Sequence, residues 1–272
     1  MGDESPTATS LFLWPGDPPA AADDVQPWLE PFLLTDRPEA GAVLIAPGGG
    51  YRYRSWVKEG RCIAERFNRE GWHAFVLAYR VTPNEHPAPL LDARRAMRLI
   101  RHHALRWGVR QDKIAACGFS AGGHLVGSLA LLEGHGSLEP ADAVSALSAR
   151  PDALILCYPV ITAGQHADQH AVATLLPAGA DDALRASVSL ERHVHADTPP
   201  TFLWHTAVDT IAPVENSLLF ALACRAKEVP IELHLYPTGR HGMGLAEPPA
   251  RVDPHVATWM PLCCEWLRSL GW

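Results

Sequence analysis

The sequence predicts an α/β fold in which a mostly parallel central sheet carries helices on both faces. Short apolar runs alternate along the chain with stretches of helical periodicity, as expected where crossover helices connect parallel strands. Of the 272 residues, 47% are hydrophobic and 19% are charged, and nine are tryptophans, so the chain can form a compact core. We expect one domain over residues 1–272, because α/β folds often reach this size as a single unit.

Six apolar runs are predicted to form the strands of this sheet. Each is short, apolar and separated from the next by turn residues or a helical stretch. Two earlier stretches, Leu11–Trp14 and Trp28–Leu34, are strand-like but interrupted by prolines, so an antiparallel edge is expected there. The six runs are Ala42–Ala46, Trp72–Ala78, Lys113–Cys117, Ala153–Tyr158, Thr201–His205 and Ile231–Tyr236.

Two helices are predicted between the first three of these runs. From Trp56 to Phe67 apolar residues recur at helical spacing, and Gly71 is placed to end the helix in a left-handed conformation. A second helical stretch, Asp92–Trp107, has one apolar stripe and four arginines off it, which we expect to form a solvated face. The stripe is Ala93, Ala96, Met97, Ile100, Ala104 and Trp107, and the arginines are Arg94, Arg95, Arg98 and Arg101.

The segment 161–196 departs from the alternation, since it is polar and rich in Ala, Asp and His. Because it lies between two predicted strands, it is expected to form a small cap insertion over the functional site. His166 and His170 would share a helical face near Asp168, a spacing that could bind zinc. No clear third ligand or orienting partner accompanies them, so we expect no metal.

The charge pattern excludes two classes of partner. The formal net charge is −7 and the basic residues form no cluster, so neither nucleic acid nor an anionic membrane surface is an expected partner. Small neutral substrates fit better, and the oligomeric state is left open, a homo-oligomer included. Residues Met1–Pro6 lack a basic region and no run is long enough to span a bilayer. We therefore expect a cytoplasmic protein without a secretory signal.

The six cysteines fall mostly within predicted strands and helices, and they form no C-x-x-C pair. We interpret them as buried thiols of a reducing compartment rather than as disulfides. None lies beside a histidine in a way that indicates a thiol nucleophile. The positions are Cys62, Cys117, Cys157, Cys224, Cys263 and Cys264.

The segment Gly118–His124 contains a G-x-S-x-G motif between a predicted strand and a helix of small residues. In such a turn, small neighbours let the chain bend sharply enough to expose the serine hydroxyl, which makes Ser120 a candidate nucleophile. Taken alone, the motif also fits a plain glycine-rich turn. It gains weight because the chain supplies an acid and a base after it in the order Ser, Asp, His.

Asp209 and His241 are the candidates for those two roles. Asp209 follows the run Thr201–His205 in a loop at the carboxyl end of a strand, although an Asp that caps the helix after Pro213 is the alternative. Glu215 is a weaker rival because it lies inside that helix. His241 follows the last predicted strand between glycines and is singled out by this position among fourteen histidines.

A second glycine-rich segment, Pro47–Tyr51, directly follows the run Ala42–Ala46. Bare backbone at this point could donate amides to the oxyanion of a tetrahedral intermediate. We assign the donors to Gly49 and Gly50, together with Ala121 after the candidate nucleophile; the alternative is a structural turn. Tyr51, at the end of the segment, is a candidate substrate-binding residue.

With these parts located, the chain resembles the α/β-hydrolase group of carbohydrate acetyl esterases and feruloyl esterases, also called acetyl xylan esterase-like or xylanase-like. The similarity extends from about Ala42 to the C-terminus, and Val208 departs from it where similar sequences often have a second Asp. The motifs that carry it are Pro47–Tyr51, Tyr79–Val81, Gly118–Leu125, Thr198–Thr206, Pro213–Ser217 and His241–Leu245.

The resemblance implies an α/β-hydrolase fold and a cofactor-free serine esterase with Ser120 as nucleophile, Asp209 as acid and His241 as base. It also implies acetyl or feruloyl esters of plant polysaccharide fragments as substrates, and the expected location favours short xylo-oligosaccharides over polymeric xylan. An arylformamidase or a small-molecule esterase with the same triad is one alternative, since fold and triad do not fix the substrate. A non-catalytic ligand-binding protein of the same fold is another.

Overall fold

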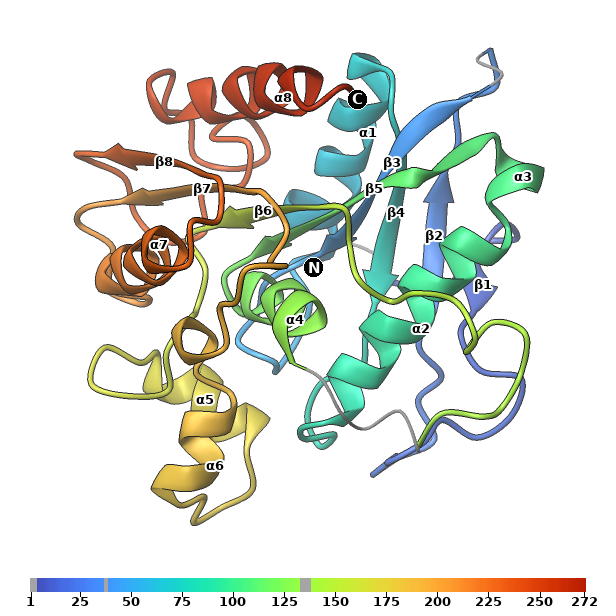
Figure 1. Ribbon diagram of the computed structural model, residues 1–272, viewed down its shortest axis with the longest axis horizontal. Helices are drawn as coiled ribbons and strands as arrows, with labels where there is room; N and C mark the ends of the chain where they lie inside the picture. Colours follow the sequence, from blue (N-terminus) through green and yellow to red (C-terminus); the bar gives the residue numbers. More distant parts are fainter. Residues whose placement is uncertain (1–3, 37–38, 133–137) are drawn as a thin grey trace.

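The computed structural model describes residues 4–36, 39–132 and 138–272. Within them, one sheet has eight strands in the order β1-β2-β4-β3-β5-β6-β7-β8 (Figure 1). The pairs from β4 to β8 are parallel, whereas β1 pairs with β2 and β2 with β4 in antiparallel fashion. The strands are β1 Leu11–Phe12, β2 Trp28–Phe32, β3 Ala40–Ala46, β4 His73–Ala78, β5 Val109–Phe119, β6 Ala153–Cys157, β7 Thr201–Thr206 and β8 Ile231–Tyr236.

These strands confirm the predicted sheet and its antiparallel edge, with changes at the strand ends. β5 begins earlier than the predicted run because Val109 also pairs with Ala40 of β3, and the register shifts between this pair and the pair Ala42 with Ile114. Further along, Ala46 pairs with Gly118, so β3 and β5 end side by side. The loops that follow these two strands are therefore neighbours at the carboxyl edge of the sheet.

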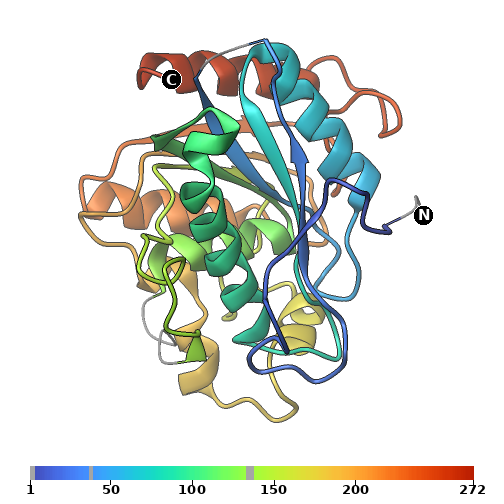
Figure 2. The same ribbon diagram turned by 90° about the vertical axis from the view of Figure 1, so that its right-hand side faces the viewer.

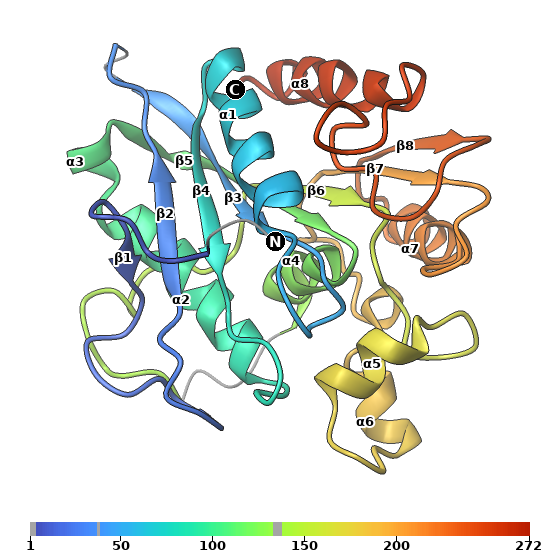
Figure 3. The ribbon, with the colours of Figure 1, turned by 180° about the vertical axis from the view of Figure 1, so that it is seen from behind.

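Helices cover both faces of the sheet (Figures 2 and 3). One face packs against α1 and α8, and the other packs against α2, α4 and α7. The helical segments are η1 Trp56–Arg61, α1 Cys62–Glu70, α2 Ala88–His102, α3 Ala104–Trp107, α4 Ala121–Leu131, α5 Gln169–Leu175, α6 Asp182–Ser187, η3 Leu190–Arg192, α7 Glu215–Ala226, η4 Val256–Thr258 and α8 Trp259–Ser269.

Side-chain alternation along the buried strands divides the core into two layers. In β3, Ala42 and Leu44 face one layer, while Val43 and Ile45 face the other. Both layers are buried because helices cover the parallel strands on each side. All six cysteines lie in the described residues as free thiols, and five of them are buried. No helix in the described ranges is long and apolar enough to cross a membrane.

The structure confirms the helix predicted from Trp56 to Phe67 and the glycine predicted to end it. It begins with a π-helical segment at Trp56 and continues as α1, and Gly71 ends it with φ 97°. The second predicted stretch forms two helices, because α2 ends at His102 and α3 begins at Ala104. Its apolar stripe packs against the sheet, but the last two residues of the stripe, Ala104 and Trp107, belong to α3.

The prediction that the four arginines of α2 form a solvated face is wrong. Arg94 and Arg95 are only 7% and 4% exposed. An irregular segment, residues 139–152, lies along this side of α2 and supplies most of the partners, which helical periodicity could not reveal. The contacts are Arg95 with Leu13 and Asp142, Arg98 with Glu139 and Leu147, and Arg101 with Ser148, Arg150 and Asp152.

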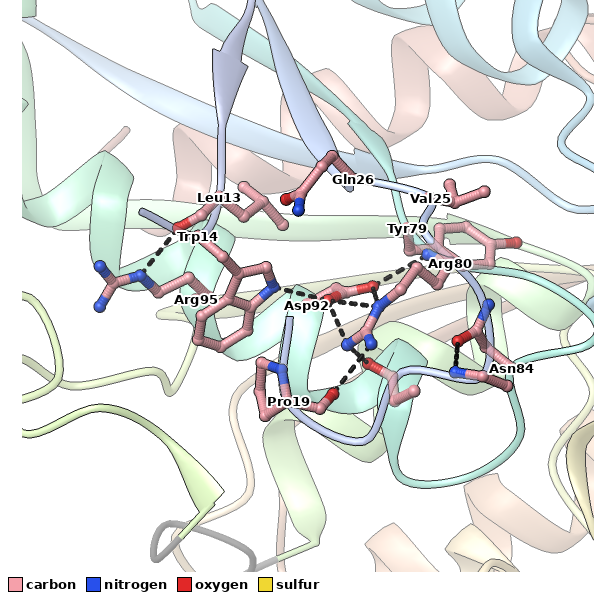
Figure 4. Close-up of polar contacts among 12 residues, drawn as sticks. Leu13, Trp14, Pro19, Val25, Gln26, Tyr79, Arg80, Asn84, Asp92 and Arg95 are labelled. Atoms are coloured by element: carbon pink, nitrogen blue, oxygen red, sulfur yellow. Dashed lines mark hydrogen bonds and ion pairs between the residues drawn. The ribbon is translucent and has the colours of Figure 1, made fainter. Parts of the chain in front are cut away.

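An ion pair between Arg80 and Asp92 lies in the core beside the N-terminal segment (Figure 4). Both side chains are fully buried, and Arg80 Nη2 lies 2.7 Å from Asp92 Oδ1. Trp14 Nε1 donates to the same carboxylate at 3.0 Å, and Arg80 Nη1 donates to the carbonyl of Pro19 at 2.8 Å. The pair therefore ties the N-terminal segment to β4 and α2.

Replacing Asp92 with Ala is expected to lower the free energy of unfolding by about 3–5 kcal/mol, because the Arg80 guanidinium would remain buried without its counter-charge. Urea denaturation of the parent protein and of Asp92→Ala measures the loss. The matched control is Asp112→Ala, which breaks a pair with Arg110 whose side chains are 39% and 69% exposed, and which should change stability by less than about 1 kcal/mol. Equal effects of the two substitutions would contradict the role given to burial.

Candidate active site

Ser120 occupies a sharp turn between β5 and α4. Its backbone has φ 53° and ψ −120°, a left-handed conformation that is strained for a residue with a side chain. The turn also demands glycine at its contacts with the sheet: a Cβ on Gly122 would lie 2.1 Å from the carbonyl oxygen of Ala46. The local sequence thus holds the Ser120 hydroxyl at the carboxyl edge of the sheet.

The structure brings Ser120, His241 and Asp209 together in one hydrogen-bonded series. His241 Nε2 lies 2.7 Å from Ser120 Oγ, and His241 Nδ1 lies 2.7 Å from Asp209 Oδ2. Because an ionised carboxylate only accepts hydrogen bonds, Nδ1 carries the proton of the neutral imidazole. The lone pair of Nε2 is then free to accept the Ser120 hydroxyl proton.

Asp209 has hydrogen-bond partners in addition to His241. Its Oδ1 accepts the amides of Ile211 at 2.9 Å and Ala212 at 3.1 Å, so it also organises the turn before α7. Burial favours the neutral acid, but hydrogen bonds from His205 and His241 outweigh burial and lower the pKa of Asp209. Asp209 is therefore ionised at neutral pH and oriented towards His241.

His205 is a supporting residue that sequence reasoning missed. It is fully buried, and its Nε2 lies 2.9 Å from the carbonyl oxygen of Ala212 and 3.3 Å from Asp209 Oδ2. Since both of these oxygens accept, Nε2 carries the proton, and Nδ1 accepts from Ser217 Oγ at 2.7 Å. Its position four residues before Asp209 offered no separate signal.

The glycine-rich segment after β3 lies beside Ser120. Gly49 and Gly50 have φ 136° and 61°, and a Cβ on Gly49 would lie 2.0 Å from the carbonyl oxygen of Tyr53. Within residues 4–36, 39–132 and 138–272, the amides of Gly49, Gly50 and Ala121 have no protein acceptor. Gly49 and Gly50 line a cleft together with Ser120 and His241. These amides are free to bind an anionic oxygen there.

Tyr51 does not reach this cleft with its side chain. The residue is 2% exposed, and its hydroxyl lies 2.8 Å from His124 Nδ1. His124 Nε2 lies 2.8 Å from the carbonyl oxygen of Val188, which can only accept, so Nδ1 accepts from Tyr51. Tyr51 and His124 thus connect the glycine-rich segment to segment 161–196. His124 was visible in the sequence only as the residue after the G-x-S-x-G-G run.

Burial lowers the pKa of His124 to about 4. An unfolded chain would take up a proton on this imidazole near pH 6.5, whereas the folded chain takes it up only near pH 4. The free energy of unfolding therefore falls as pH drops through this window, by about 3 kcal/mol in total from His124. His124→Gln, which keeps a donor and an acceptor but cannot titrate, should reduce the pH dependence.

Urea denaturation of the parent and of His124→Gln at pH 7 and pH 4.5 measures how much free energy of unfolding each protein loses on acidification. Other groups titrate in the same range, but they are common to both proteins and cancel in the comparison. A His124→Gln variant that loses as much stability on acidification as the parent would contradict the assignment.

Glu59 is another buried group that the sequence did not single out. Its Oε2 accepts the amide of Gly48 at 3.0 Å, and its Oε1 accepts the hydroxyl of Tyr158 at 2.8 Å. The Tyr158 oxygen in turn accepts the amide of Gly244 at 2.9 Å, and the Tyr158 ring meets the His241 ring edge-on at 5.1 Å. Glu59 and Tyr158 therefore connect the glycine-rich segment to the loop that carries His241.

The cleft at Ser120 has a volume of about 350 Å³, and charged and polar side chains line it together with Tyr53 and Ile211. Segment 161–196 contributes Asp168, His170 and Ala171 to it, and Asp168 caps α5 by accepting the amides of the other two. The segment holds α5, α6 and η3 and lies next to α4 and α7 (Figures 1 and 3). Among the described residues, no three His, Cys, Asp or Glu side chains are grouped to hold a metal ion.

A model of the BD-FAE family matches residues 35–223, well over half of the chain. The chain belongs to the BD-FAE family. The matched region includes Ser120 and Asp209, whereas His241 lies beyond it. Over 227 residues the chain is 40% identical to endo-1,4-beta-xylanase B of Butyrivibrio fibrisolvens. The aligned region covers 81% of this chain and 35% of that protein. It is 28% identical to an acetylxylan esterase of Xylanibacter ruminicola, over 88% of this chain and 46% of the relative.

The structural comparison confirms the predicted fold and group. An acetyl ester-xyloside bifunctional hydrolase from Caldicellulosiruptor lactoaceticus has a crystal structure with a TM-score of 0.90 and 39% identity, covering 99% of each chain. The family and this neighbour place the chain among the carboxylic ester hydrolases of the α/β-hydrolase class. The chain spans less than half the length of the two relatives compared by sequence.

Proposed function

We propose that the chain is a serine esterase that removes acetyl groups from the hydroxyls of carbohydrates such as xylo-oligosaccharides. The observation that carries the proposal is the series Ser120, His241, Asp209, with 2.7 Å at each hydrogen bond, at the edge of a cleft. Three groups in this order can generate a nucleophile, take its proton and stabilise the resulting imidazolium.

In the acylation half-reaction, Ser120 Oγ attacks the carbonyl carbon of the ester while His241 Nε2 takes the hydroxyl proton. The carbonyl oxygen becomes an anion, and the amides of Gly49, Gly50 and Ala121 donate to it. As the bond to the alcohol oxygen breaks, His241 delivers its proton to that oxygen. The products are the free alcohol and an acetyl ester of Ser120.

In the second half-reaction, His241 takes a proton from water, whose oxygen attacks the acetyl carbon. The same amides hold the new oxyanion, and its collapse returns the proton from His241 to Ser120 Oγ and releases acetate. Asp209, ionised at neutral pH, stabilises the imidazolium in both halves. Side chains, main-chain amides and water supply every step, so no cofactor is required.

Four polar side chains in the wall of the cleft support a hydroxyl-rich alcohol. Arg52, Lys58, Asp168 and His170 all line the cleft and offer donors and acceptors to sugar hydroxyls. The relatives support the same substrate class, because an acetylxylan esterase and an acetyl ester-xyloside hydrolase are among the proteins that this chain resembles. Feruloyl esters of the same carbohydrates are the wider substrate range to test.

A hydrolysis panel tests the proposed substrate. Acetylated xylo-oligosaccharides are expected to give the highest kcat/KM, methyl ferulate a lower one, and N-formylkynurenine no detectable turnover. Faster cleavage of the formamide than of any acetyl ester would identify an arylformamidase instead. A protein that binds these compounds but cleaves none of them would contradict the esterase proposal.

A further inference from the structure

We propose that the enzyme binds its substrate through at least two linked sugars, the second of which lies over Tyr53 and in a cavity beyond it. The inference rests on the proposed carbohydrate esterase function. It concerns a cavity of about 410 Å³ next to the cleft at Ser120. The residues lining this second cavity are Glu4, Tyr53, Arg54, Ser55, Trp56, Val57, Lys58 and Pro249.

The second cavity adjoins the cleft at Ser120. Tyr53, Ser55 and Lys58 line both, and all three belong to the stretch between β3 and α1. A substrate whose acetyl carbonyl is at Ser120 and whose sugar leaves the cleft on this side must pass these three residues. The adjoining cavity is therefore the space available to the next sugar of the chain.

Tyr53 is suited to contact that sugar. The residue is 59% exposed, although its main chain is fixed by the glycine-rich segment: its amide donates to the carbonyl oxygen of Gly49 at 3.3 Å. An exposed ring on a fixed backbone gives an apolar surface at little cost in conformational entropy. The C–H face of a pyranose can pack on such a ring while its hydroxyls remain free for hydrogen bonds.

The second cavity also has polar groups that suit a neutral polyol. Arg54 pairs with Glu4 at 2.9 Å, so the charges near this wall are largely compensated and favour a neutral sugar over an anionic chain.

The test compares kcat/KM for acetylated xylose, xylobiose and xylotriose, with 4-nitrophenyl acetate as a substrate that has no sugar. In the parent enzyme, kcat/KM is expected to rise about tenfold from the monosaccharide to the disaccharide, chiefly through KM. The quantity to follow in variants is the ratio of kcat/KM for the trisaccharide to that for the monosaccharide, because it cancels any general loss of activity.

Tyr53→Ala should lower this ratio by about fivefold to tenfold, and Tyr53→Phe should preserve it because the ring is retained. Val57→Trp, which places a bulky side chain in the second cavity, should lower the ratio as well. A ratio near one in the parent, or a ratio unaffected by both Tyr53→Ala and Val57→Trp, overturns this inference alone. Failure to cleave any acetylated sugar while 4-nitrophenyl acetate is hydrolysed overturns the proposed carbohydrate specificity and this inference with it.

Discussion

Replacing Ser120 with Ala is expected to lower kcat/KM for 4-nitrophenyl acetate by about 10⁴- to 10⁶-fold. The loss is this large because the acyl-enzyme route disappears when Oγ is removed, while the oxyanion amides can still accelerate direct attack by water to a small extent. The loss should lie in kcat. Steady-state kinetics measures it, and circular dichroism should show a fold like that of the parent.

The matched control is Ser128→Ala, which removes a buried serine hydroxyl from α4, the helix that directly follows Ser120. Ser128 is two helical turns from Ser120, and its substitution should leave kcat/KM within about threefold of the parent. A Ser120→Ala protein that retains more than about 1% of the parent activity, measured on preparations free of parent enzyme, would show that another group is the nucleophile.

Replacing Asp209 with Asn is expected to lower kcat by about 10³- to 10⁴-fold with little change in KM. The amides of Ile211 and Ala212 both donate to Oδ1, so the oxygen of the new amide is held there. Its NH₂ group must then face His241 Nδ1 and forces the proton onto Nε2. In that tautomer Nε2 points an N–H at Ser120 and cannot take its proton.

Asp181→Asn serves as the control for this substitution. Asp181 also accepts a backbone amide at the start of a helix, α6, but among the described residues it has no hydrogen bond to a histidine. Kinetic parameters close to those of the parent are expected. If Asp209→Asn lowers kcat by less than tenfold, the orientation of His241 does not depend on this carboxylate and the proposed mechanism needs another acid.

Elements with local determinants could be predicted from the sequence. The turn at Ser120 depends on two glycines within two residues of it, and the end of α1 depends on the left-handed conformation of Gly71. Position in the alternating pattern was enough to select Asp209 and His241 as candidates, because functional loops follow strands at one edge of a parallel sheet. The structure then placed these side chains within hydrogen-bonding distance of one another.

Groups whose partners are distant in the chain could not be predicted. Glu59 bonds to Tyr158, 99 residues away, and His124 bonds to the main chain of Val188, 64 residues away. Neither residue has neighbours in sequence that reveal such a contact. The same limit explains the error at Arg94 and Arg95, since helical periodicity shows which side of a helix is apolar but not whether a loop covers the other side.

Labelling with a fluorophosphonate, followed by mass spectrometry of the digested protein, tests most directly whether Ser120 is the activated nucleophile. The reagent phosphonylates a serine whose proton is taken by a base, so the account predicts one adduct, on the peptide that contains Ser120. The adduct should be absent in Ser120→Ala and should form far more slowly in His241→Ala. Ester hydrolysis that persists in a protein with no adduct at Ser120, or an adduct on a different serine, would contradict the account.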